Sequence, residues 1–164
     1  MNYNFDTAVI GGGIMGCNTA LNLARGGMKV AVVERRGLCM GPSGVNVGTL
    51  TLHTKPVSMV PYHRRSIELW KKSADWLADV GVRERGGLTI AFTDEDTELL
   101  TAELEDRNAA GAPTEIIDSK RIQQIDPAIS ERIRFAYYCP LDGYANSNLT
   151  GRAFHKVLGQ EGVD

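Results

Sequence analysis

The chain has 164 residues and a formal net charge of −2, from 18 Lys and Arg against 20 Asp and Glu, and 43% of its residues are hydrophobic. This fits one globular domain or part of a larger one, and the near-zero charge gives no electrostatic basis for binding nucleic acid. No apolar run approaches the ~18 residues that would cross a bilayer, and residues 1–6 lack the basic and apolar pattern of a secretory signal.

The first elements form a recognisable unit. Thr7–Ile10 is a short apolar run before three glycines, which predicts a buried strand that ends in a tight turn. Good helix formers over Ile14–Arg25 predict a helix, and Gly26 marks its end. Val30–Val33 is again apolar throughout and predicts a second strand. A strand, a helix and a strand within about 30 residues are typical of a parallel βαβ unit, so we expect an α/β fold.

The rest of the chain predicts a mixture of helices and strands after an irregular, Gly-rich stretch that reaches Leu52. Asp118 is expected to cap a brief helix that Pro127 terminates. Further helices are expected over residues 58–79, 94–110 and 147–159, and strands over 87–93, 115–117 and 134–139, the last of them antiparallel. A further strand is expected to begin at the final residues, Gly162-Val163-Asp164.

Gly11-x-Gly13-x-x-Gly16 joins the first strand to the first helix. In such a turn the first glycine permits the tight bend, the second lets the backbone approach a pyrophosphate, and the third lets helix and strand pack closely. The helix N-terminus then directs unpaired N–H groups and its positive dipole end at the phosphates. The position of the turn between strand and helix makes it a candidate dinucleotide-binding turn.

Glu34 ends the second strand 18 residues after Gly16 (34 − 16), close to the ~20 expected for a carboxylate that binds ribose hydroxyls. An acidic residue there disfavours the 2′-phosphate of NADP, although the neighbouring Arg35 and Arg36 could accommodate one. The spacing therefore indicates an adenine dinucleotide without separating FAD from NAD.

Residues 6–16, followed by Ala20, Leu23, Gly27, Val30 and the pair Glu34-Arg35, resemble the N-terminal signature of the D-amino-acid oxidase-like flavoproteins. These include glycine, sarcosine and D-amino-acid oxidases and dehydrogenases. Further along, residues 43–48 resemble the family's Ser-Gly-x-Asn-x-Gly loop beside the flavin, 86–90 its excursion into a substrate domain, and 142–144 the segment that leads back. The resemblance covers essentially the whole chain, but only the N-terminal part of the usual family chain.

The resemblance implies a glutathione-reductase-like FAD-binding domain with a Rossmann βαβ unit, and part of a mixed α+β substrate domain. Its segments would be residues 1–80 (FAD-binding), 81–144 (substrate) and 145–164 (a helix returning to the FAD-binding domain). It also implies hydride transfer from the α-carbon of an amine or amino acid to flavin N5. The FAD-binding residues implied are Gly11, Gly13, Ile14, Met15 and Gly16 around the pyrophosphate, Glu34 at the ribose, Arg35 beside the adenosine, and Ser43, Asn46, Gly48 and Thr49 along the path to the isoalloxazine.

No residue of the chain is predicted to be a catalytic acid or base, and in this family the groups that bind the substrate carboxylate lie beyond the position of residue 164. We therefore expect the parent protein to be the enzyme and the 164-residue chain by itself to be inactive. His53 follows the flavin loop, and we expect a solvated loop histidine rather than a covalent attachment point for FAD.

The three cysteines, Cys17, Cys39 and Cys139, are odd in number and spaced 22 and 100 residues apart, which fits neither a disulfide framework nor a zinc cluster. The sequence thus indicates reduced thiols and a cytoplasmic location, with Cys17 packed as a small side chain against a strand. The three histidines are scattered, so no metal site is expected. Peripheral membrane contact of the parent protein and its oligomeric state are left open.

Two other functions are consistent with parts of this pattern. An NAD-dependent dehydrogenase would share the glycine turn and Glu34, but its βαβ pattern would continue promptly after Glu34, where this chain has a loop rich in Gly, Ser and Asn. A non-catalytic fragment or subunit could retain the fold without binding a cofactor. Flavin absorbance of the purified protein separates these hypotheses.

Overall fold

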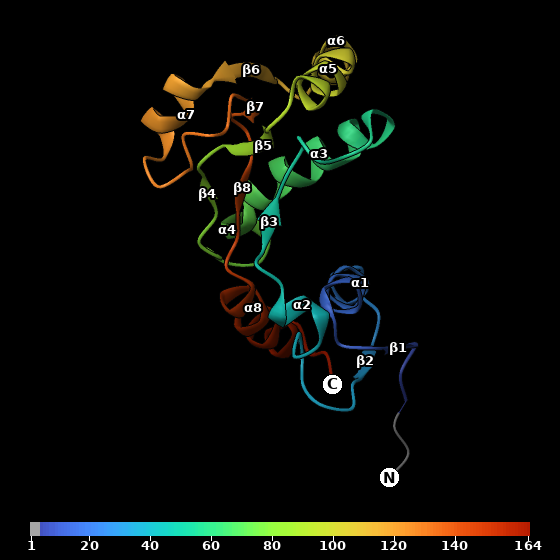
Figure 1. Ribbon diagram of the computed structural model, residues 1–164. Helices are drawn as coiled ribbons and strands as arrows, with labels where there is room; N and C mark the ends of the chain where they lie inside the picture. Colours follow the sequence, from blue (N-terminus) through green and yellow to red (C-terminus); the bar gives the residue numbers. More distant parts are fainter. Residues whose placement is uncertain (1–3) are drawn as a thin grey trace. The chain divides into compact units, whose positions relative to one another are not determined.

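A computed structural model describes residues 4–164, which divide into two compact units (Figure 1). The first comprises the described residues up to Gly48, with Lys72–Gly81 and Ala145–Asp164. The second comprises Thr49–Lys71 and Val82–Tyr144. The assignment of these units to a cofactor domain and a substrate domain stays a prediction; the sequence interpretation differs from this division in grouping residues 49–71 with the first part.

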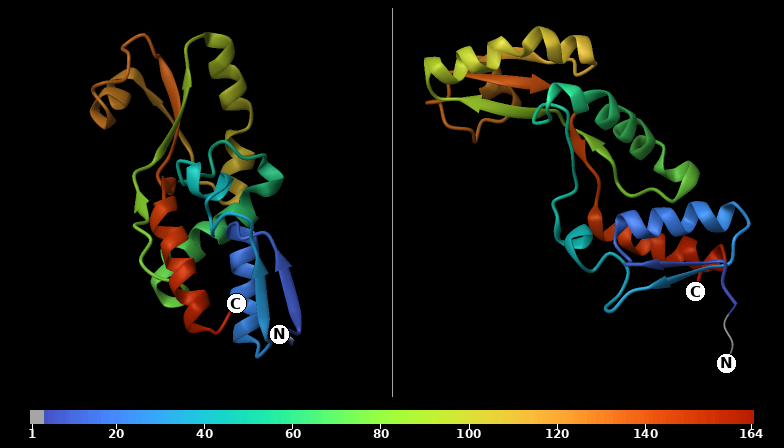
Figure 2. Two further views of the ribbon diagram at one scale, coloured as in Figure 1. Left: turned by 90° about the horizontal axis from the view of Figure 1, so that it is seen from below. Right: turned by 90° about the vertical axis from the view of Figure 1, so that its right-hand side faces the viewer.

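The N-terminal βαβ unit has the bounds that the sequence predicted. Strands β1 (Thr7–Ile10) and β2 (Val30–Val33) are adjacent and parallel, with Thr7 opposite Val30, and helix α1 (Ile14–Arg25) connects them. Cys17 on α1 is completely buried, which confirms that it is a packed side chain. Figure 2 shows α1 running alongside both strands. The glycine turn therefore lies at the carboxyl end of β1, where parallel sheets place their ligands.

Three shorter or later helices complete the first unit: α2 (Pro42–Val45), α4 (Ser73–Trp76) and α8 (Ser147–Gln160). Asn146 caps α8 by accepting a hydrogen bond from the Leu149 N–H at 3.0 Å. The backbone of Asp164 pairs with β2, because its N–H donates to the Val30 carbonyl and its carbonyl accepts from the Val32 N–H. This is the hydrogen-bond pattern of a parallel neighbour, as expected for a strand at this point.

The second unit is built on an antiparallel sheet in the order β5 (Gly87–Ala91), β7 (Phe135–Cys139), β6 (Glu115–Asp118). Helix α7 (Ser119–Ile125) covers one face, where Ile117, Ile122, Ile133 and Ala136 form a core. Helices α5 (Asp94–Ala102) and α6 (Leu104–Ala110) lie on the other side (Figure 2). The remaining elements are η1 (Val57–Met59), α3 (Val60–Lys71) and a small sheet of β3 (Thr49–Leu50), β8 (Gly143–Tyr144) and β4 (Arg83–Glu84).

Three expected elements are shorter or divided. The helix expected over 58–79 ends at Lys71, and α4 is separate, because Lys72 leaves the helical conformation with ψ +21°. The helix expected over 94–110 breaks at Glu103. The strand expected over 87–93 ends at Ala91 because Thr93 instead caps α5, its hydroxyl accepting from the Asp96 N–H at 3.1 Å. An apolar period that continues through a break does not reveal the break.

Among residues 4–164, no helix is both long and apolar enough to cross a bilayer. Within that same range, no group of three or more His, Cys, Asp or Glu side chains is placed to hold a metal ion.

Candidate cofactor site

The turn between β1 and α1 depends on two glycines for different reasons. Gly11 has φ +102°, a conformation that side chains disfavour. A Cβ on Gly16 would lie 1.9 Å from the Gly11 carbonyl oxygen, so the first turn of α1 packs directly on the bend. Gly13 differs, because a Cβ there would meet only the Ser43 hydroxyl, at 3.2 Å. Gly16 is therefore required by the fold, whereas a Cβ on Gly13 would meet a single side-chain atom, the Ser43 hydroxyl oxygen, in a tight contact.

The N-terminus of α1 receives a polar group from another segment. The Ile14 N–H donates to the Ser43 hydroxyl oxygen at 3.0 Å, which brings the Gly-rich loop against the start of the helix. The first N–H groups of any helix lack intrahelical acceptors, and they carry the positive end of the helix dipole. This end of α1 is accordingly suited to an anion.

Glu34 is tied to the same turn. Its carboxylate accepts the Gly12 N–H at 2.8 Å and the Arg36 N–H at 3.0 Å. These hydrogen bonds, with that of Gly12 the stronger cause, lower the pKa of Glu34, and the positive charge of Arg35 adds to the effect. The carboxylate is thus ionised at neutral pH and held at the edge of the turn.

A cavity of about 220 Å³ lies where these groups meet. Of the site residues expected from the sequence, Gly13, Glu34, Arg35 and Ser43 line it, while Gly11, Ile14, Met15 and Gly16 form the adjoining turn and first helical turn. Its other lining residues were not assigned to FAD from the sequence: Gly12, Arg36, Gly37, Met40, Gly41 and Pro42. Pro42 at the first position of α2 was the available signal for a helix start in this loop.

Asn46 and Gly48 shape the loop and do not line this cavity. The Asn46 amide accepts from the Gly48 N–H at 2.7 Å and donates to the Ser43 carbonyl at 2.7 Å, so it braces the loop that carries Ser43. Gly48 has φ +71°, and a Cβ there would lie 1.9 Å from the Ala145 carbonyl oxygen. Thr49 belongs to β3 in the second unit. Contact of these three residues with a cofactor stays a prediction.

The lowered pKa of Glu34 predicts a pH-dependent contribution to stability. Because the folded-state pKa lies below the ordinary value of 4.5, the Gly12–Glu34 contact should stabilise the fold fully above about pH 4.5 and lose its effect as pH falls through the folded value. We expect wild type to exceed Glu34→Gln in free energy of unfolding at pH 7, with the difference shrinking below pH 4.5. Urea unfolding across this range measures it, and a constant difference would contradict the contact.

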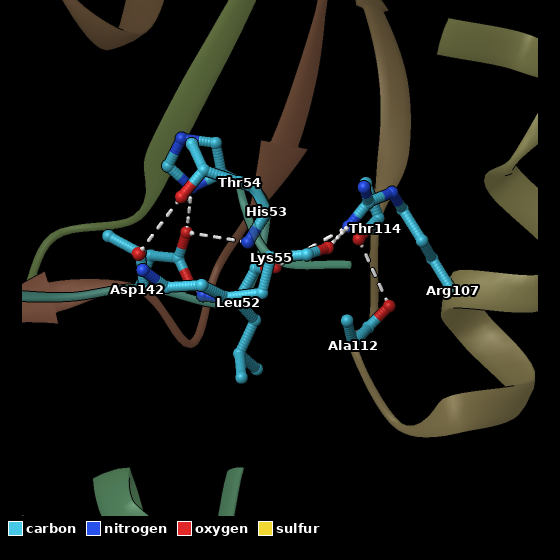
Figure 3. A network of polar contacts seen from close by, with 9 residues as sticks. Leu52, His53, Thr54, Lys55, Arg107, Ala112, Thr114 and Asp142 are labelled. Carbon is cyan, nitrogen blue, oxygen red and sulfur yellow. Dashed lines mark hydrogen bonds and ion pairs between the residues drawn. The ribbon is translucent and has the colours of Figure 1, made fainter. Parts of the chain in front are cut away.

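The second unit contains a buried polar network around Asp142 (Figure 3). Asp142 is 1% exposed, and its carboxylate accepts the Leu52 N–H at 2.7 Å and pairs with Nδ1 of His53. A Cβ on Gly87 would lie 2.6 Å from both side chains, so the pair is tightly enclosed. The expectation that His53 is a solvated loop residue is therefore wrong, because a carboxylate 89 residues later in the chain covers it.

Arg107 supports the same loop from α6. It is 7% exposed, and its guanidinium donates to the Lys55 carbonyl and to the Glu103 carboxylate, each at 2.8 Å. Together with Asp142, it fixes residues 52–55 from two sides (Figure 3). The hydrogen bonds that Asp142 and Arg107 make all join protein groups, while the buried Nε of Arg107 has no partner within residues 4–164. These contacts indicate a structural role within this unit.

Comparison with known proteins places these features in context. The family model described as "FAD dependent oxidoreductase" (DAO) matches residues 6–164. The chain is 24% identical to an opine oxidase subunit of Rhizobium meliloti over 98% of this chain and 47% of that protein. It is 28% identical to glycine oxidase of Bacillus licheniformis over the whole chain and 45% of that protein. The crystal structure of glycine oxidase from Geobacillus kaustophilus superposes with a TM-score of 0.90 at 23% identity, covering 99% of this chain and 46% of that one. The chain thus spans about half the length of these relatives.

Proposed function

Because the chain belongs to the DAO family of FAD-dependent oxidoreductases, we propose that it supplies the FAD-binding turn of an enzyme that oxidises the C–N bond of an amine or amino acid. The observation that carries the proposal is the convergence of Glu34, Ser43 and the N-terminus of α1 on one small cavity. We assign the activity to a protein of the relatives' full length that contains this chain, and expect the chain alone to be inactive.

The residues present fit a dinucleotide. The cavity is smaller than the ~300–1,000 Å³ typical of pockets for whole organic ligands, so it suits the diphosphate and its ribose rather than the entire cofactor. Gly13 lines the cavity and carries no Cβ, so its backbone can approach a phosphate that a side chain would obstruct. Arg35 and Arg36, both on the cavity wall, add positive charge near the expected phosphates.

Each residue then has a defined task. The N–H groups at the start of α1 hold the diphosphate, with Ser43 able to exchange its hydrogen bond from Ile14 for one to a phosphate oxygen. Glu34 keeps free lone pairs beyond those used by Gly12 and Arg36, and these accept the ribose hydroxyls. Bound FAD supplies the electron acceptor for hydride transfer, which explains why the chain needs no acid or base of its own for that step.

The substrate class is taken from the relatives. Glycine oxidase and dimethylglycine dehydrogenase are among the proteins similar to this chain, as is the opine oxidase subunit. We infer a small amine or amino acid, and no partner beyond this substrate is assigned. Anaerobic addition of glycine, sarcosine, D-alanine or L-proline should bleach the flavin absorbance of the full-length protein if the proposal is correct. A flavoprotein reduced by glycerol 3-phosphate alone would contradict the C–N assignment.

An NAD-dependent dehydrogenase is the alternative that shares the turn and Glu34. The match over residues 6–164 to an FAD-dependent family supports FAD instead. Equilibrium binding separates them, because NAD⁺ should not compete with FAD at the turn.

Removing the Glu34 carboxylate should weaken FAD binding. In Glu34→Ala the ribose loses a charged acceptor, so we expect the FAD dissociation constant to rise about tenfold or more, measured by quenching of flavin fluorescence. The FAD dissociation constant of Glu34→Gln, which retains one acceptor oxygen, should lie between those of wild type and Glu34→Ala. Glu68→Ala, an exposed carboxylate in the second unit, serves as the control. An unchanged dissociation constant in Glu34→Ala would refute the ribose assignment.

A further inference from the structure

Two cysteines of the first unit meet behind the glycine turn at one backbone oxygen. The Cys17 thiol lies 3.3 Å from the Gly12 carbonyl oxygen, and the Cys39 N–H donates to the same oxygen at 2.7 Å. Cys17 is 0% exposed and Cys39 is 5% exposed. Helix α1 and the loop after β2 are thereby joined at Gly12, which lines the same cavity as Glu34.

The loop holds Cys39 in an uncommon conformation. Cys39 has φ +57°, and among residues 4–164 it is the one non-glycine residue with a positive φ. Such a conformation is disfavoured by about 1 kcal/mol or more and persists only where surrounding contacts enforce it. Those contacts include α8, since a Cβ on Gly151 would come within 3.1 Å of the Cys39 Cβ. The thiol of Cys39 is thus positioned by the fold rather than by local preference.

The two thiols interact and differ in acidity. Interaction with the Cys17 side chain lowers the pKa of Cys39. The Cys39 side chain, together with burial, raises the pKa of Cys17. Cys139 lies in the second unit, and burial raises its pKa to about 11. Of the three thiols, Cys39 is the one most readily present as the nucleophilic thiolate.

Cys39 is also the less buried member of the pair. It lines a cavity of about 700 Å³ within the first unit, whose wall includes Leu38, Met40 and, from α8, Arg152 and His155. Cys17 does not line that cavity and is completely buried. A small oxidant that enters this cavity therefore meets Cys39 before Cys17.

We propose that Cys17 and Cys39 are a peroxide-sensitive pair that forms a reversible disulfide across the cofactor turn. The Cys39 thiolate attacks one oxygen of hydrogen peroxide, the O–O bond breaks, and the departing hydroxide takes a proton to become water, leaving a sulfenic acid. Cys17 then loses its proton and attacks the Cys39 sulfur, the S–O bond breaks, and a second water leaves. Two electrons pass from the two thiols to one peroxide.

The bond would connect the first turn of α1 to the wall of the Glu34 cavity. Gly37, Met40 and Gly41 flank Cys39 and line that cavity, so a link to Cys17 holds this wall in place. The inference does not require that FAD be the cofactor.

Peptide mapping tests the proposal on the purified protein treated with excess hydrogen peroxide at low protein concentration. We expect two of the three thiols to be lost, a peptide linking residues 17 and 39, and full recovery with dithiothreitol. Cys139→Ser should behave as wild type in forming this link, because Cys139 is equally buried but lies in the other unit. Cys17→Ser should stop at the sulfenic acid, which dimedone traps on residue 39.

Several results would overturn the proposal. These are a wild-type protein whose Cys17 and Cys39 are both recovered as free thiols after peroxide, a dimedone adduct that forms at Cys139 before Cys39, or a disulfide that joins two separate chains. Circular dichroism of each variant before treatment shows whether it is folded. Should Cys17→Ser be unfolded, the linked peptide in Cys139→Ser decides the question by itself.

Discussion

Gly13→Val should abolish FAD binding while the protein remains folded. The backbone of Gly13 has φ −74° and ψ 177°, which valine adopts without strain, and its Cβ would meet only the Ser43 hydroxyl at 3.2 Å. The branched side chain would instead fill the space through which a diphosphate approaches the start of α1. We expect flavin content of the full-length protein to fall from stoichiometric to below detection, with unfolding by urea changed by less than about 1 kcal/mol.

Gly16→Ala is the matched comparison for this prediction. Its Cβ would lie 1.9 Å from the Gly11 carbonyl oxygen. The backbone must move to relieve this steric clash. This variant should lose flavin and stability together, because the turn itself is distorted. Stoichiometric flavin in Gly13→Val would show that the diphosphate lies elsewhere. A loss of stability in Gly13→Val as large as in Gly16→Ala would show that its effect is structural.

The βαβ unit could be predicted from the sequence because its determinants are local. Each apolar run, the glycine turn and the closing Gly26 act within a few residues of the element they define, and β1, α1 and β2 have the expected bounds. The same holds for Asp118, which caps α7 as expected by accepting from the Arg121 N–H at 2.9 Å. A helix N-cap can be predicted from the sequence where a single side chain provides the capping hydrogen bond.

Contacts between distant segments could not be predicted in this way. The two-residue strands β3, β4 and β8 are too short to show a period, and they exist only because they pair with one another. Nothing local to His53 indicates that Asp142 encloses it, and nothing near Cys17 indicates that Cys39 shares its carbonyl acceptor. Ser43 was assigned to the cofactor path by resemblance, yet its contact with the Ile14 N–H is visible only in the structure.

Asp142→Ala should destabilise the second unit more than any surface substitution there. The change leaves the His53 ring and the Leu52 N–H buried without their acceptor. Each buried donor left without its acceptor costs about 1–3 kcal/mol. The free energy of unfolding should fall by that amount in urea titrations. Glu84→Ala, which breaks the exposed ion pair with Lys71, should change it by less than ~1 kcal/mol.

Residue-specific hydrogen exchange can localise the effect, because the two units need not unfold together. In Asp142→Ala the amides of Leu52 and His53 should exchange far faster than in wild type, while the amide of Cys17 in α1 should be unchanged. The double variant His53→Ala with Asp142→Ala should cost less than the sum of its single changes, since each single change leaves the other group unpaired. Strict additivity, or uniform acceleration of exchange in both units, would show that Asp142 does not act through His53.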